Sequence, residues 1–291
     1  MSLATVLSSF KECVAAFFSN FIPSAQAKQK IITGQVVLIT GAGNGLGKLM
    51  AIEFAKLKAC LVLWDVDESS LLTVKTACEN LGADVNTGIV DISDRHNVYG
   101  EADIVLNKFQ KIIDILINNA GILRKGGSFL LKDDESMEKT VQINMVSHFW
   151  LAKAFLPGMV ATNSGHIVSV CSLAGLVGAF DLVDYSASKF GAFGFQEALE
   201  NEVYNQGYKN IKFTTVCPSF VATNMLSEIP SLTSPNVLDP KLVVDNIIRA
   251  ILTEMRILIL PNTAYFLYAI KGLVPRSVFQ KILLWNLNNY S

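Results

Sequence analysis

The sequence predicts an α/β fold in which one doubly wound parallel sheet of about seven strands carries helices on both faces. Three observations predict it. Short apolar segments alternate with stretches of helical periodicity along most of the chain, as in parallel sheets covered by helices. The first apolar segment leads directly into a glycine-rich loop and a helical stretch. The chain has 291 residues, of which 51% are hydrophobic and 17% charged, so it is too apolar to be disordered.

Seven segments are predicted to be strands, because each is a short run rich in apolar and β-branched residues bounded by turn residues. They are residues 36–40, 61–65, 85–91, 115–119, 166–172, 211–217 and 257–260. Helical spacing is found at residues 45–58, 68–81, 94–110, 134–160, 183–206 and 239–254. Because helices follow nearly every strand, residues 31–261 are expected to form one Rossmann-type domain.

The two ends of the chain lie outside this pattern. Residues 1–22 form two apolar blocks interrupted by Lys11 and Glu12, and Pro23 ends them. A mid-segment charged pair disfavours a spanning helix, and a first charge at Lys11 disfavours a secretory signal. Residues 1–30 are therefore expected to be a membrane-associating segment and linker that lies at a lipid surface. A flexible or core-packed extension is the alternative.

The C-terminal tail, residues 262–291, mixes apolar and aromatic side chains with Lys271, Arg276 and Lys281. This composition is typical of an amphipathic helix at a membrane or over a substrate mouth. Ordinary packing on the domain is an equally open interpretation.

The charge balance and the cysteines exclude several classes of function. There are 24 basic and 25 acidic residues, so no basic excess favours nucleic acid. The five cysteines lie far apart without a CxxC pair, and the three histidines are scattered. Neither a disulfide framework nor a metal site is expected, and a reducing compartment is favoured.

The loop at residues 40–47 is predicted to hold the diphosphate of a dinucleotide. Its glycines allow a tight turn and close approach of backbone N–H groups, and the following helix directs its positive dipole end at the same place. The spacing is GxxxGxG rather than the commoner GxGxxG, so the strand and helix around it carry the argument. The expected contacts are Gly41, Asn44, Gly45, Leu46 and Gly47.

Asp65 ends the second predicted strand, 18 positions after Gly47. A carboxylate there can accept hydrogen bonds from both ribose hydroxyls and repels a 2′-phosphate. No basic residue adjoins Asp65, and Asn44 stands where a cation would help to bind that phosphate. NAD is therefore expected in preference to NADP; a turn-capping aspartate is the alternative.

Tyr185 and Lys189 stand four positions apart early in a predicted helix, which places them on one face. An ammonium about 4 Å from a phenol stabilises the phenolate enough to bring a pKa of about 10 near 7. Ser172 ends the fifth predicted strand, where α/β sheets place ligands, and can hold a substrate oxygen beside Tyr185. A serine hydrolase is disfavoured because no GxSxG surrounds Ser172.

Taken together, these motifs resemble the short-chain dehydrogenase/reductase family over residues 33–260. The matching motifs, in the family's order, are TGAGNGLG, Asp91, Asn118-Asn119-Ala120-Gly121, Asn144, Ser172, Tyr185-x-x-x-Lys189 and Pro218 to Thr223. Ser219 is a departure, because many members carry glycine there.

The resemblance implies a role for each matching residue. Tyr185 would be the general acid/base, Lys189 would lower its pKa and hold ribose hydroxyls, and Ser172 would orient the substrate oxygen. Asn144 would support a water-linked proton relay.

The remaining motif residues would contact the cofactor. Asp91 would lie near the adenine and Thr223 would touch the carboxamide. The other residues implied to line the cofactor are Asn118, Ala120, Gly121 and Pro218.

Further stretches, among them ILINNAGI and DYSASKFGAFGF, resemble the branch that contains epidermal-type retinol dehydrogenases and lipid-droplet hydroxysteroid dehydrogenases. That resemblance implies an enzyme at the endoplasmic reticulum membrane or the lipid droplet, with its catalytic domain facing the cytosol. It also implies a homodimer paired through the helices at 134–160 and 183–206.

Apolar loops at residues 173–180 and 220–232 favour a lipophilic substrate: a retinol, a hydroxysteroid or a long-chain alcohol. Two alternatives stay open. One is an NADPH-linked reductase of lipid ketones or aldehydes, and the other is a non-catalytic lipid-droplet protein that retains the fold.

Overall fold

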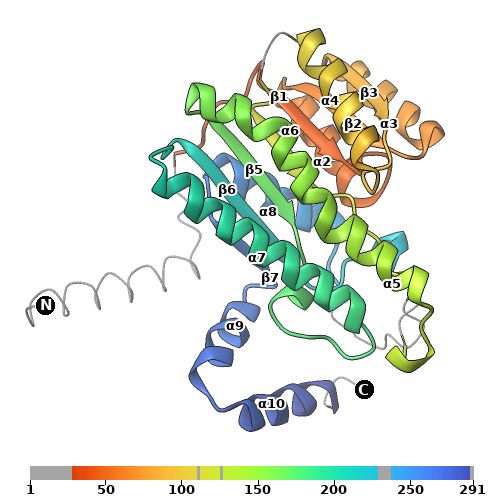
Figure 1. The fold of residues 1–291 in the computed structure, drawn as a ribbon, viewed down its shortest axis with the longest axis vertical. Helices are drawn as coiled ribbons and strands as arrows, with labels where there is room; N and C mark the ends of the chain where they lie inside the picture. The colour runs from red at the N-terminus through yellow and green to blue at the C-terminus, as the bar shows by residue number, and fades with distance from the viewer. Residues whose placement is uncertain (1–27, 110–111, 125–126, 229–236, 289–291) are drawn as a thin grey trace, which may run out of the picture.

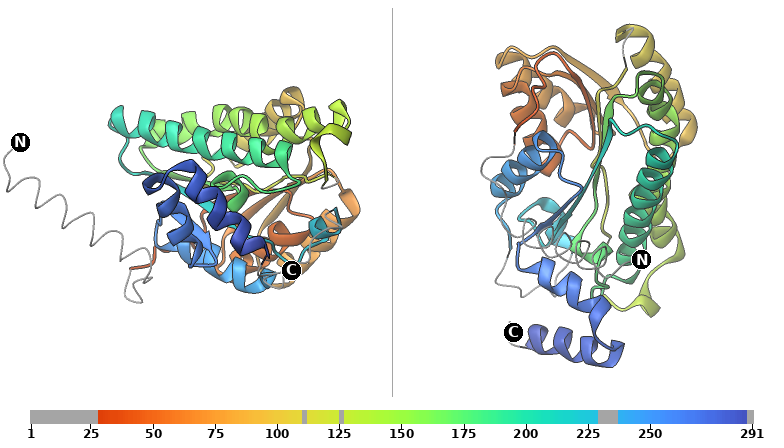
Figure 2. Two further views of the ribbon diagram at one scale, coloured as in Figure 1. Left: turned by 90° about the horizontal axis from the view of Figure 1, so that it is seen from below. Right: turned by 90° about the vertical axis from the view of Figure 1, so that its left-hand side faces the viewer.

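The computed structural model describes residues 28–109, 112–124, 127–228 and 237–288. A seven-stranded sheet in the order β3-β2-β1-β4-β5-β6-β7 forms its centre, and every strand pair is parallel. Helices cover both faces of the sheet (Figures 1 and 2). The predicted fold class is confirmed.

The strands agree with the predicted segments to within two residues at each end. They are β1 (Val36–Thr40), β2 (Cys60–Asp65), β3 (Val85–Ile89), β4 (Ile115–Asn118), β5 (Gly165–Val170), β6 (Ile211–Pro218) and β7 (Ile257–Leu260). The helices are α2 (Gly45–Lys56), α3 (Glu68–Asn80), α4 (Arg95–Phe109), α5 (Asp134–Val141), α6 (Ser147–Thr162), α7 (Val183–Asn205), α8 (Pro240–Leu252), α9 (Ala264–Leu273) and α10 (Arg276–Asn288).

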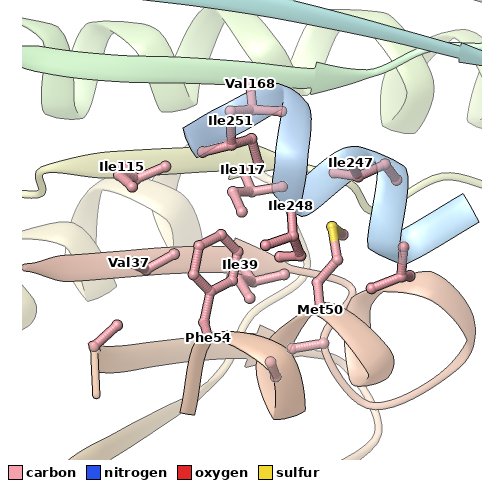
Figure 3. Packing of buried hydrophobic residues seen from close by; sticks show 14 of the residues in the cluster. Val37, Ile39, Met50, Phe54, Ile115, Ile117, Val168, Ile247, Ile248 and Ile251 are labelled. Atoms are coloured by element: carbon pink, nitrogen blue, oxygen red, sulfur yellow. The ribbon is translucent and has the colours of Figure 1, made fainter. Parts of the chain in front are cut away.

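One face of the sheet is covered by α2, α3 and α8. Figure 3 shows side chains of α2 and α8 meeting over β1 and β4, with Met50 and Phe54 of α2 beside Ile248 of α8. All three are almost fully buried. Burial of such side chains contributes about 1.5–3 kcal/mol each relative to exposure, so this layer holds α2, and with it the glycine-rich turn, against the sheet.

The other face is covered by α4, α6 and α7. Its core includes Trp64 of β2 and Phe155 of α6, whose ring centroids lie 5.7 Å apart. Because both faces are buried, the strands read as continuous apolar runs rather than as alternating patterns.

The predicted helix at 134–160 is in fact three elements. Between α5 and α6 the chain widens into a π-helical turn, η2 (Gln142–Val146), which contains Asn144. Such turns occur frequently at functional sites. The apolar spacing of the sequence continues through the turn, so it does not reveal the change.

The tail forms two helices, α9 and α10, at one end of the sheet–helix layers (Figures 1 and 2). Ala264, Tyr265 and Phe279 are buried in a cluster with Cys171 and Cys217. The expected membrane-associating segment falls mostly in residues 1–27, outside the described residues. Within the described part of the chain, no helix is long and apolar enough to cross a bilayer.

Candidate active site

A large cavity lies at the carboxyl ends of the strands. The strand order reverses between β1 and β4, and ligands of open α/β sheets bind at such a switch point. The cavity has a volume of about 1640 Å³, and its wall extends from the glycine-rich turn to α9 and α10. One continuous space therefore connects the glycine-rich turn with α9 and α10.

In the turn after β1, backbone segments approach each other too closely to leave room for side chains. Gly41 has a φ of +64°, and a Cβ there would lie 2.8 Å from the Cα of Ala120. A Cβ on Gly47 would lie 2.0 Å from the carbonyl oxygen of Gly41. Only glycine fits at both places, so backbone N–H groups at the start of α2 face the cavity without a side chain between them. This arrangement fits a bound diphosphate.

Asp65 joins this turn to the next strand. Its Oδ2 accepts a hydrogen bond from the Gly43 N–H at 2.8 Å, and its Oδ1 accepts one from the Asp67 N–H at 3.1 Å. The carboxylate also lines the cavity. Lys189 is the only lysine or arginine among the described residues of the cavity wall, so no cation stands beside Asp65 there.

Asp91 also lines the cavity. Burial raises the pKa of its carboxyl, but hydrogen bonds from Ser93 and the ammonium of Lys139, 3.3 Å away, outweigh it and lower the pKa. Asp91 is therefore an ionised acceptor at neutral pH.

In the Asn118–Gly121 motif at the end of β4, Asn119 lines the cavity and Asn118 does not, although Asn118 was the asparagine expected to line the cofactor. The side chain of Asn118 is buried, lies off the cavity wall, and has no hydrogen-bond partner among the described residues. Its neighbour Asn119 is on the wall and donates from Nδ2 to the carbonyl oxygens of Thr40 (2.9 Å) and Gly41 (3.2 Å). Ala120 and Gly121 line the cavity as expected.

Tyr185 and Ser172 both line the cavity wall, and the Ser172 hydroxyl acts on the phenol by favouring its ionised form. The Ser172 hydroxyl also accepts from the Ala174 N–H at 3.1 Å and donates to the Pro218 carbonyl at 3.4 Å. Burial raises the pKa of Tyr185 to about 12, and the nearby Ser172 hydroxyl opposes that rise. The phenol is therefore protonated at neutral pH.

Lys189 stands next to Tyr185 on α7. Its Nζ donates to the Val170 carbonyl at 3.0 Å and lies 5.8 Å from the centroid of the Tyr185 ring. Burial lowers the pKa of Lys189. Burial is the largest cause that sets the Tyr185 pKa in this structure, and it acts in the direction opposite to the lowering expected from Lys189.

Asn144 lies directly behind the wall and is fully buried. Its Oδ1 accepts from the Ile122 N–H, and its Nδ2 donates to the Ile122 carbonyl, both at 2.8 Å. A Cβ on Gly121 would meet Asn144 Oδ1 at 3.1 Å and Lys189 Nζ at 3.3 Å. The missing side chain of Gly121 therefore leaves room between the amide and the ammonium.

The remaining predicted residues occupy the wall on both sides of this centre. Those of the glycine-rich turn that line the cavity are Gly41, Asn44, Gly45 and Leu46. Pro218, the last residue of β6, and Thr223, in the loop that follows, also line it. Gly47 lies behind the turn. Sequence reasoning missed Asn119 as a wall residue, although its place one position after β4 was the available indication.

The rest of the wall is strongly apolar. Leu173, Val177 and Phe220 come from loops that follow β5 and β6, and Phe266 and Ile270 come from α9. An apolar pocket with few polar groups is suited to an apolar ligand.

The parallel sheet, the glycine turn and the Ser172–Tyr185–Lys189 wall define a dinucleotide-dependent oxidoreductase of the Rossmann type. Residues 35–232 match the model of the short chain dehydrogenase family. The chain belongs to that family, whose fold binds NAD or NADP, and it acts as an oxidoreductase.

Individual relatives are consistent with this family membership. The chain is 40% identical to human estradiol 17-beta-dehydrogenase 11 over 260 residues, 89% of this chain and 85% of the relative. It is 44% identical to human epidermal retinol dehydrogenase 2 over 252 residues, 85% of this chain and 80% of the relative. A short chain dehydrogenase/reductase from Burkholderia phymatum, solved in complex with NAD, superposes with a TM-score of 0.76 at 25% identity and covers 84% of this chain and 94% of its own. Similar structures hold NAD in one case and NADP or NADPH in others.

Proposed function

We propose that this protein interconverts a lipophilic alcohol and its carbonyl compound with NAD, and that the substrate is a retinol, a hydroxysteroid or a long-chain alcohol. One observation carries the proposal: Ser172 and Tyr185 line the same cavity as the glycine turn and an apolar wall. The names of the retinol and estradiol dehydrogenases among the relatives support the substrate class.

In this proposal the chain's own residues orient the substrate and move one proton. The Ser172 hydroxyl holds the substrate oxygen against the phenolic oxygen of Tyr185. The Tyr185 phenolate accepts the carbinol proton in oxidation, and the phenol donates it to the carbonyl oxygen in reduction. Lys189 favours the phenolate by its charge and binds ribose hydroxyls. A nicotinamide dinucleotide held at the glycine turn would accept the hydride in oxidation and supply it in reduction.

Asn144, behind the wall, would connect Tyr185 to solvent, and residues of the wall would hold the cofactor. Asn144, fixed by both backbone groups of Ile122, would hold a water in a proton relay through Lys189. Asp91 would accept from the adenine, and Thr223 would contact the carboxamide. Asn118 would act by supporting Asn119 and the strand end rather than by touching the cofactor.

The preference for NAD rests on Asp65. Its carboxylate faces the cavity without a cation beside it on the described wall, so a 2′-phosphate would be repelled and left without a partner.

A second candidate, reduction of a lipid ketone or aldehyde, is favoured by one observation. A phenol whose pKa is about 12 is already protonated at neutral pH and is ready to donate to a carbonyl oxygen. The same residues serve both directions.

We also propose the division of the chain and its surroundings. Residues 31–261 would form the catalytic domain, residues 1–30 would attach it to the endoplasmic reticulum membrane or a lipid droplet on the cytosolic side, and the tail would cover the substrate end. Two copies would pair through α5–α6 and α7. A monomeric mass in mild detergent would contradict the pairing.

The experiment that tests the function is a panel of retinol, hydroxysteroids and long-chain alcohols, added with NAD to the membrane-purified protein. Appearance of NADH at 340 nm, lost in Tyr185→Phe, is the expected result. Activity confined to small polar alcohols would contradict the lipophilic substrate.

A further inference from the structure

Helix α9 is fixed to the domain at both of its ends. In its first turn, the buried Tyr265 hydroxyl donates to the Ile257 carbonyl at 2.9 Å and accepts from the Ile259 N–H at 3.1 Å. Both partners belong to β7. The helix start is therefore tied to the edge strand of the sheet.

In the last turn of α9, the ammonium of Lys271 makes two contacts. Its Nζ donates to the Leu176 carbonyl at 2.5 Å and lies 4.6 Å from the centroid of the Phe190 ring. Leu176 follows the short helix after Ser172, and Phe190 follows Lys189. Lys271 thus ties the end of α9 to the two segments that carry the reacting side chains.

Between these two anchors, α9 presents Phe266, Leu267 and Ile270 to the cavity. Phe266 is 62% exposed although it lines the wall. An exposed aromatic ring at a cavity gains by contact with an apolar ligand, because the ligand removes it from water. Ordinary packing within the domain does not explain that exposure.

The neighbouring wall has the same character. Leu173 and Val177 line it from the Ser172 side, and Ile282 and Leu283 line it from α10. Neither α9 nor α10 contributes a charged side chain to the described part of the wall. A carboxylate or phosphate at the far end of a substrate would find no cation there, whereas a neutral hydrocarbon would be well covered.

We propose that α9, held by Tyr265 and Lys271, is the wall that selects substrates by the length of their neutral apolar body. The inference rests on the proposed function and adds a specificity-determining element to it. The carbinol would sit at Ser172 and Tyr185, and the distant hydrocarbon would lie along Phe266, Leu267 and Ile270. Lys271 is a positioning residue, because it acts through the helix rather than on the substrate.

The test uses the full-length protein, with Lys271→Met to release the end of the helix and Phe266→Ala to remove one wall contact. Phe266→Ala changes an exposed side chain, so it is expected to fold normally. Lys281→Met, an exposed lysine of α10 that lies off the wall, is the matched control. Binding of all-trans-retinol is followed by its fluorescence, and KM and kcat are measured with butanol and with hexadecanol.

Retinol affinity is expected to fall about tenfold in Phe266→Ala and about fivefold in Lys271→Met, and to be unchanged in Lys281→Met. KM should rise for hexadecanol by similar factors with kcat kept, while kcat/KM for butanol changes less than about twofold, because butanol is too short to reach the wall.

Two results would overturn the inference: unchanged retinol affinity in both variants, or equal losses for butanol and hexadecanol. The experiment distinguishes an error in the proposed function from an error in the role proposed for α9. If no alcohol reduces NAD but retinol binding weakens in both variants, the proposed function is wrong and the role of α9 in binding is supported. If wild-type protein oxidises both alcohols and the variants bind retinol normally, the proposed function is supported and the role proposed for α9 is wrong.

Discussion

The ammonium of Lys189 lies 5.8 Å from the centroid of the Tyr185 ring and gives its hydrogen bond to the Val170 carbonyl rather than to the phenol. The two side chains share one face of α7, as their spacing predicts. Burial of both groups nevertheless decides their protonation, since it raises the pKa of Tyr185 to about 12 and lowers that of Lys189.

This relationship predicts opposite pH dependences for the two directions. Oxidation needs the phenolate, so kcat/KM for an alcohol should rise about tenfold per pH unit while the pH stays below the Tyr185 pKa. Reduction needs the phenol, so its rate should stay level and fall only above that pKa. Initial rates from pH 6 to 10 in both directions measure this; oxidation that peaks below pH 7 would contradict it.

Removal of the phenol hydroxyl should abolish the chemistry without loss of the fold. Tyr185→Phe is expected to lower kcat about a thousandfold, and Ser172→Ala about a hundredfold because the substrate oxygen loses a partner. Tyr204→Phe, at an exposed position of α7, is the matched control. The melting temperatures should show that all three variants are folded.

The charge of Asp65 should set the cofactor preference. Asp65→Asn keeps an oxygen that can accept from the Gly43 N–H and removes the repulsion of a 2′-phosphate. The ratio of kcat/KM for NAD to that for NADP should fall by about tenfold, the size of one partly screened charge contact. An unchanged ratio, or a wild-type preference for NADP, would show that Asp65 does not discriminate.

The glycine turn should tolerate no side chain at Gly47. A Cβ there would lie 2.0 Å from the Gly41 carbonyl oxygen, so Gly47→Ala must displace the turn or α2. We expect a loss of about 1–3 kcal/mol of unfolding free energy together with weaker NAD binding. Gly100→Ala, in open space on α4, should be neutral or slightly stabilising, and calorimetry compares the two.

The buried ion pair between Lys132 and Asp184, at the start of α7, should stabilise the fold only while both charges are present. Lys132 and Asp184 are in contact, with side chains 8% and 3% exposed. Lys132→Met leaves the Asp184 charge buried and unpaired, which costs about 3–5 kcal/mol. The double variant Lys132→Met/Asp184→Asn should recover much of that loss.

The comparison for this prediction is the exposed pair of Lys56 and Glu53, where Lys56→Met should cost less than about 1 kcal/mol. Denaturant unfolding measures all of these variants. Equal losses at both pairs would contradict the role assigned to burial.

The fold was predictable because local and global preferences agree over residues 31–261. Runs such as Val36–Thr40 are both good strands and good buried surface, and the helices between them have one apolar face. The candidate site followed from the ends of those strands, which a parallel sheet brings to one edge.

Other features of the structure could not be predicted from local sequence patterns. The π-helical turn at Asn144 does not interrupt the apolar spacing, and the different surroundings of Asn118 and Asn119 depend on which way each amide points from the strand end. Pairs such as Lys271 with Leu176, or Lys132 with Asp184, join segments distant in sequence, so no local pattern contains them.

The order of residues alone determined the class of fold, the place of the glycine turn and most of the predicted residues that line the cavity, because these depend on periodicity and on spacing within single elements. Only the tertiary structure decided how strongly Tyr185 holds its proton and that α9 lines the apolar part of the cavity. Both depend on burial and on contacts between distant segments, and these exist only after the chain has packed.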